Sequence, residues 1–227
     1  MLLLSTLALV TSPGHADTTT TVPALLRATQ HQVDRGWGAG DPAERLEHFR
    51  NAEELAREAL ALSPAKPEAR WWLVVALGLT AQESPLLRRI GLVRELRAQT
   101  ESLLEEAPNH PGGHHAMGRL HAAVSRLDPV SRGLITLLAG GDELDAASWD
   151  TAESHLRRAL ELEPGAPHHS VELARILRDR GQPDEAYREA ERALAATADT
   201  PLAHWYRGWA AELLEELGPE GRATRPR

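Results

Sequence analysis

Apolar and small residues recur along the chain at steps of four, three and one, separated by polar positions. The segment from Ala52 to Pro64 shows the pattern most clearly, with Ala56, Ala59 and Leu60 between its ends. Such steps place side chains on one face of an α-helix, and a proline after the last turn ends the helix. Three further copies predict three similar helices: Ala152, Leu156, Ala159, Leu160 and Pro164; Ala186, Ala190, Ala193, Leu194 and Ala198; and, more loosely, Leu96, Thr100, Leu103, Leu104 and Pro108.

A second series predicts where the alternate helices begin. Pro67, Pro111, Pro167 and Pro201 each follow the end of one copy by three residues, and proline is well suited to the first helical turn. Each unit is therefore predicted to be a helix, a two-residue gap and a second helix. The residues seven positions after these prolines are small or β-branched, which predicts where two helices of a hairpin cross: Val74, Gly118, Ala174 and Gly208.

Hairpins of this kind must stack, because one hairpin alone cannot bury the apolar face of each helix. The sequence thus predicts an all-α solenoid of about four helix hairpins and a closing helix over residues 44–217. Residues 17–43 are predicted to hold a first helix, and residues 218–227 to form a flexible tail. The insertion from Asp128 to Ala147 carries an apolar run around Leu134 and predicts a short extra helix.

Two resemblances to known proteins follow from these motifs. The stretch from Pro167 to Leu194 resembles a tetratricopeptide (TPR) repeat. The residues that match are Leu173, Ala174, Leu177, Gly181, Ala186, Ala190, Ala193 and Leu194. The order of three other motifs resembles the regulator of microtubule dynamics family: PEARWW from Pro67, HPGGHHAMGR from His110 and SWDTA from Ser148.

The second resemblance covers roughly residues 44–217 and implies a TPR-like α-α superhelix. Some eukaryotic members of that family bind microtubules or act at membrane contact sites with phospholipid binding. An export signal would separate this chain from microtubules. We therefore carry over the implied fold and not the microtubule role.

The first sixteen residues predict a signal peptide. Met1 to Val10 is an uncharged apolar run, and the small residues Gly14 and Ala16 suit cleavage after Ala16. Ten apolar residues are too few to span a bilayer, which needs about 20. We expect an exported, periplasmic or secreted protein with no integral membrane span after cleavage. The alternative is a buried first helix, in which case the protein is cytoplasmic.

The composition and the absence of known catalytic motifs argue against several classes of function. The net charge of −8 argues against nucleic-acid binding, and the absence of cysteine removes disulfides and thiol catalysis. The sequence contains no G-x-S-x-G elbow and no phosphate-cradling glycine-rich loop. We therefore expect a protein that is not an enzyme and has no cofactor.

The concave surface of such a stack is where ligands usually bind, and the first helix of each hairpin lines it. Residues four and eight positions after each opening proline share one helical stripe. Arg178, three residues beyond Arg175, continues that stripe. The predicted groove therefore consists of Trp71, Val75, His115, Arg119, Val171, Arg175, Arg178, Trp205 and Trp209.

Clustered guanidinium groups suit a carboxylate or a phosphate. The leading prediction is a peptide or protein partner, of acidic character, bound in the groove. The alternative is a lipid or other amphiphile in the same groove, and a third possibility is an assembly scaffold that oligomerises through Trp205 and Trp209. Against the groove, Arg175 also has Glu172 and Asp179 at helical pair spacing, as on an ordinary solvated face.

The eleven histidines do not predict a metal site. His114 and His115 are adjacent and diverge by about 100° around a helix. His114 and His121 share a face but lie two turns, or about 10 Å, apart. His110 is separated from both by Pro111 and two glycines, and His168 and His169 belong to the next repeat. We expect no metal.

Overall fold

The computed structural model describes residues 21–128, 133, 147–197 and 200–218. The predicted signal peptide, nearly all of the predicted insertion helix and residues 219–227 of the predicted tail lie outside this part of the chain. Every regular element in the described part is a helix. None of these helices combines the length and the apolar character that crossing a membrane requires.

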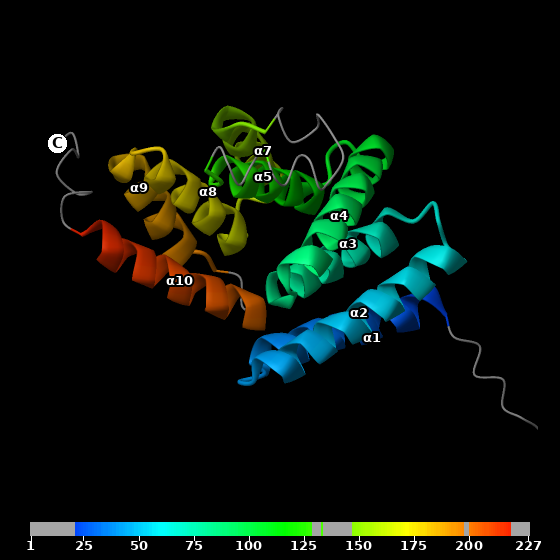
Figure 1. The fold of residues 1–227 in the computed structure, drawn as a ribbon. Coiled ribbons are helices and arrows are strands. Elements are labelled where there is room, and N and C mark those ends of the chain that lie inside the picture. The colour runs from blue at the N-terminus through cyan, green and yellow to red at the C-terminus, as the bar shows by residue number, and fades with distance from the viewer. Residues whose placement is uncertain (1–20, 129–132, 134–146, 198–199, 219–227) are drawn as a thin grey trace, which may run out of the picture.

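The described helices form four hairpins and one closing helix, which confirms the predicted TPR-like α-α superhelix (Figure 1). The pairs are α1 (Val22–Gly38) with α2 (Pro42–Leu62), α3 (Pro67–Glu83) with α4 (Leu86–Glu106), α5 (Pro111–Ser125) with α7 (Trp149–Leu162), and α8 (Pro167–Asp179) with α9 (Pro183–Leu194). Helix α10 (Pro201–Leu217) closes the stack. Helix α1 lies within the segment 17–43, where a first helix was predicted, and it pairs with α2 as part of the stack.

The predicted alanine faces are the interfaces within and between the hairpins. Ala52, Ala56 and Ala59 of α2 are fully buried, as are the corresponding residues of α7 and α9. A small residue at these positions brings two helix backbones close together, and the larger apolar residues beside them fill the remaining space.

Gly118 confirms one of the predicted crossing points. A Cβ added there would lie 2.7 Å from Cγ of Leu156 and 3.0 Å from the backbone oxygen of Ala152, so α5 and α7 touch at this glycine. Gly208 does not mark a crossing. Nothing lies within 4 Å of a Cβ added there, because no helix follows α10 to pack on that face within the described residues.

Short polar side chains cap several helices and fix where they begin. Asp41 accepts hydrogen bonds from the backbone nitrogens of Ala43 and Glu44, at 2.9 and 3.0 Å. Nδ1 of His110 accepts one from the nitrogen of Gly113 at 3.1 Å. A cap of this kind satisfies a backbone donor that the first turn leaves unpaired. His110 therefore has a structural role at the start of α5.

The first helices of the hairpins form a continuous inner layer. Helix α3 contacts α1 and α5, and α8 contacts α5 and α10. Helix α10 in turn contacts α1, so the two ends of the stack meet (Figure 1). The indole rings of Trp37 and Trp209 form that contact, edge to face, with their centroids 5.6 Å apart.

Candidate functional site

Two of the predicted groove arginines lie on either side of one carboxylate in the inner layer. Nη1 of Arg175 donates to Oε1 of Glu172 at 2.9 Å, and Nε of Arg119 lies 3.8 Å from the same oxygen. Arg119 comes from α5, whereas Glu172 and Arg175 lie one turn apart on α8. We call these three residues the inner arginine cluster.

The inner arginine cluster has an unbalanced charge. Glu172 is 6% exposed, while the side chains of Arg119 and Arg175 are 37% and 31% exposed. Two guanidinium groups share one carboxylate, which leaves one positive charge in excess. The attraction of Glu172 raises the pKa of Arg119. The cluster thus presents partly exposed donors over a buried anion.

Aromatic side chains of α10 border the inner arginine cluster. The guanidinium carbon of Arg175 lies 5.1 Å from the ring centroid of Trp209, a cation–π distance. Tyr206 packs edge to face on Trp209, with centroids 4.8 Å apart. Burial raises the pKa of Tyr206 to about 12, so its hydroxyl stays protonated and can donate a hydrogen bond.

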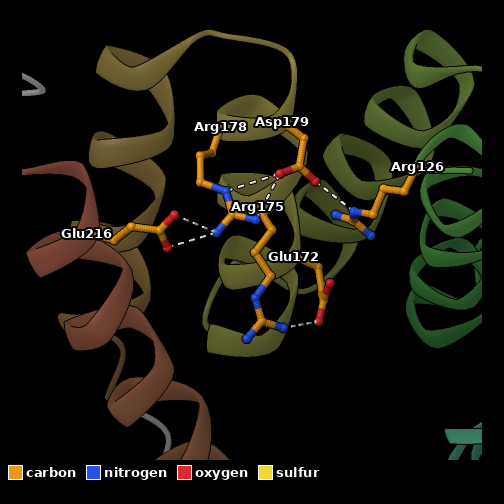
Figure 2. Close-up of polar contacts among 6 residues, drawn as sticks. All are labelled: Arg126, Glu172, Arg175, Arg178, Asp179 and Glu216. Atoms are coloured by element: carbon orange, nitrogen blue, oxygen red, sulfur yellow. Dashed lines mark hydrogen bonds and ion pairs between the residues drawn. The ribbon is translucent and has the colours of Figure 1, made fainter. Parts of the chain in front are cut away.

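Arg178 belongs to a different group of charges, although it was predicted on the same stripe (Figure 2). Its guanidinium contacts Asp179 at 2.8 Å and Glu216 at 2.9 Å. The other oxygen of Asp179 accepts from Arg126 at 2.6 Å. In this second group two arginines face two carboxylates, so its charges balance. Asp179 is thereby occupied by these two arginines, and Arg175 pairs with Glu172 (Figure 2).

The structure places the other predicted groove residues in several environments. Val171 is fully buried in an apolar cluster with Ala193, Tyr206 and Ala210, so it does not line a groove. Periodicity alone predicts which residues share this stripe, but it does not predict that α9 and α10 pack on α8 and cover Val171.

Trp71 and Val75 of α3 contribute mainly to packing between repeats. Trp71 packs against His110, with the rings tilted and their centroids 5.3 Å apart, and it fills the space beside Gly112, where an added Cβ would lie 2.5 Å from its ring. Val75 packs with Trp37 and Trp72 in another apolar cluster. Trp205 is 47% exposed, in contrast to Trp209 on the same helix.

Sequence reasoning missed a cluster of histidines at the junction of α5 and α8. Nδ1 of His115 lies 3.1 Å from Nδ1 of His169, and the ring of His168 packs on that of His169 with centroids 4.0 Å apart. Nε2 of His169 lies 3.3 Å from a carboxylate oxygen of Glu163. The predicted opening prolines of consecutive repeats were a usable signal, because His115, His168 and His169 all follow one within four residues.

Sequence similarity to known proteins identifies the family of this chain. The sequence profile of Regulator of microtubule dynamics protein 1-3 matches residues 10–218. The chain belongs to this family. The rat (Rattus norvegicus) Regulator of microtubule dynamics protein 3 is 26% identical over 147 residues, which cover 64% of this chain and 31% of the rat protein.

Two other kinds of protein resemble this member of the family. The Cellulose synthase operon protein C of Xanthomonas axonopodis pv. citri (strain 306) is 25% identical over 79% of this chain and 15% of that protein. The chain therefore spans less than a third of the length of these curated relatives. Among solved structures, a thermophilic TPR protein of Thermus thermophilus has 20% identity and a TM-score of 0.38, covering 82% of this chain and 100% of that one.

Proposed function

We propose that this chain is a non-enzymatic interaction module whose inner arginine cluster binds a carboxylate of a peptide or protein partner. A TPR-like fold and membership of the family support a protein-interaction role. The observation that carries the finer proposal is that Arg119 and Arg175, both partly exposed, share the single buried carboxylate of Glu172.

A guanidinium group has five N–H donors in a planar fork, which matches the two oxygens of a carboxylate. The 3.8 Å separation of Arg119 from Glu172 is longer than a hydrogen bond, so this ion pair does not saturate the donors of Arg119. An incoming carboxylate would therefore find donors on two helices and an excess positive charge. Trp209 and Tyr206 beside them favour an apolar residue next to that carboxylate.

The arginines of the charge-balanced group around Arg178 are less suited to binding a new carboxylate than those of the inner arginine cluster. A carboxylate that approached Arg178 would have to displace Asp179 or Glu216, because both already contact its guanidinium. We therefore assign the predicted anion binding to Arg119 and Arg175 and not to Arg178.

The test is a binding titration with fluorescent acidic peptides that end in a free carboxylate. We expect the variant with Arg119→Gln and Arg175→Gln to bind at least about tenfold more weakly, equivalent to about 1.4 kcal/mol. Arg178→Gln is the matched control, from the same helix, and should bind as the wild type does. Equal binding by all three proteins would overturn the proposal. If the protein sediments with vesicles of an anionic phospholipid but binds no peptide, the ligand of the site is a lipid and not a peptide.

We also infer that residues 1–16 direct export of the chain. The support is the apolar run from Met1 to Val10 followed by Gly14 and Ala16. Expression of the full chain and N-terminal sequencing of the purified product should give Asp17 as the first residue. A product that retains Met1 would contradict this inference.

A further inference from the structure

Three histidine side chains from two helices converge at the junction of α5 and α8. One ring nitrogen from each of His115, His168 and His169 lies within 4.8 Å of the other two. Three such atoms lie within about 2.8 Å of a common centre, which is that distance divided by √3. Zinc binds imidazole nitrogen at about 2.0–2.1 Å. Shifts of less than about 1 Å would therefore bring all three nitrogens to one ion.

His115 and His169 already have nearly the separation of two ligands on one ion. Two nitrogens at about 2.0–2.1 Å from a tetrahedral zinc ion are about 3.3–3.4 Å apart. The Nδ1 atoms of His115 and His169 are 3.1 Å apart. These two nitrogens share a hydrogen bond in the metal-free protein, and an ion that replaced its proton would find both ligands at nearly the required separation.

Glu163 holds His169 in the orientation that a ligand needs. Its carboxylate lies 3.3 Å from Nε2 of His169, on the side of the ring away from His115. A metal-binding histidine commonly donates its second N–H to a carboxylate, which fixes the tautomer and makes the other nitrogen more basic. With Nε2–H donated to Glu163, Nδ1 of His169 offers its lone pair.

Burial and charge around the three rings are compatible with a cation. His169 is fully buried and His115 is 6% exposed, whereas His168 retains some exposure and offers a way in for an ion. The positive charge of Arg119, which shares Glu172 with Arg175, acts against a cation at the three rings, and the carboxylate of Glu163 beside His169 acts in its favour.

We propose that His115, His168 and His169 form a site for one divalent transition-metal ion of the zinc type, with Glu163 orienting His169. Imidazole nitrogens suit zinc, copper and nickel rather than calcium or magnesium. Three protein ligands leave a fourth position for water or another ligand, as in sites of this composition. This proposal revises the expectation of no metal drawn from the sequence, and it does not depend on the proposed peptide binding.

The test uses the full chain without a polyhistidine tag, stripped with a chelator and titrated with Zn²⁺ alone by calorimetry. We expect one ion per chain, and we expect Co²⁺ at the same site to give the visible absorption of tetrahedral cobalt. Glu163→Gln should weaken Zn²⁺ binding by about 10–100-fold. Glu163 is 53% exposed, so this change is not expected to alter the fold, which circular dichroism would verify.

His155→Gln is the matched control. His155 lies 2.9 Å from His114 through their Nδ1 atoms and so belongs to another histidine pair. This variant should bind Zn²⁺ as the wild type does, whereas His169→Gln should lose the site. Failure of the wild type to bind Zn²⁺ would overturn the proposal. Binding that is unchanged by Glu163→Gln but lost in His155→Gln would also overturn it, because the ion would then lie at the other pair.

Discussion

Trp37 in the first described helix and Trp209 in the last make an edge-to-face contact with ring centroids 5.6 Å apart. Trp209 also lies under the guanidinium of Arg175, 5.1 Å from its carbon. The contact that joins the two ends of the stack therefore also supports one side of the inner arginine cluster. Closure of the inner layer and the geometry of the candidate site are linked through this one indole.

Trp209→Ala should destabilise the protein by about 2–4 kcal/mol, because it removes a partly buried aromatic ring and its contacts with Trp37 and Tyr206. Urea unfolding measures the change. Trp205→Ala on the same helix is the control and should change stability by less than about 0.5 kcal/mol, since Trp205 is 47% exposed. A coupling energy near zero between Trp37→Ala and Trp209→Ala would contradict the closure contact, which should give about 0.5–1.5 kcal/mol.

Two glycine-to-alanine substitutions should change the stability of the protein in opposite directions. Gly118→Ala forces a methyl group to within 3.0 Å of the backbone oxygen of Ala152, and should cost about 1–3 kcal/mol. Gly208→Ala adds a methyl group with nothing within 4 Å in an exposed helix interior, and should stabilise by about 0.5–1 kcal/mol. Thermal unfolding of both variants measures the two changes in stability. A neutral Gly118→Ala would mean that α5 and α7 are farther apart than described.

Stability should fall as the pH is lowered from 7 toward 5.5. Burial lowers the pKa of His155 to about 4 and that of His168 to about 3, below the value of about 6.5 in an unfolded chain. In this window the unfolded chain binds more protons than the folded one, so acid favours unfolding. We expect a loss of about 1–2 kcal/mol over the window, reduced by the partial exposure of both rings.

Urea midpoints at the two pH values measure this dependence. His155→Gln removes one of the responsible rings and should make the dependence shallower. A stability that is constant or rises between pH 7 and 5.5 would show that these histidines are not buried in the neutral form.

The helical repeat was predictable because its signal is local. Alanines at steps of four and three, such as Ala52 and Ala56, define a buried face from the periodicity of one helix alone. The same periodicity cannot say which neighbour covers a face. Val171 was therefore assigned to the groove, although α9 and α10 bury it.

The histidine site depends on relations that no single helix contains. His115 and His169 are 54 residues apart, and the docking of α5 against α8 brings their rings together. The different environments of Arg175 and Arg178 likewise depend on α10, which places Glu216 against Arg178 and Trp209 against Arg175. The position of Arg175 and Arg178 on one helical stripe predicts that both are candidates for anion binding. It does not predict that only Arg178 is already paired with carboxylates in a balanced group.

Glu172→Gln should strengthen the binding of an anionic peptide and lower the free energy of unfolding of the protein. The change removes the carboxylate that Arg119 and Arg175 share, so the excess charge at the cluster rises by one. The two arginines lose their buried partner, which should cost about 1–2 kcal/mol once their exposure is taken into account. Peptide titration and urea unfolding of the same sample measure both effects. Weaker peptide binding by a folded Glu172→Gln protein would contradict the role given to the cluster.

Carboxylate binding at Arg119 and Arg175 is tested by comparing one acidic peptide with a free C-terminal carboxylate and the same peptide with an amidated C-terminus. Both are titrated against the wild type and against the variant with Arg119→Gln and Arg175→Gln. We expect amidation to weaken binding to the wild type by about tenfold or more, and we expect the variant to bind the two peptides equally. Equal binding of both peptides by the wild type would contradict a carboxylate site at these two arginines.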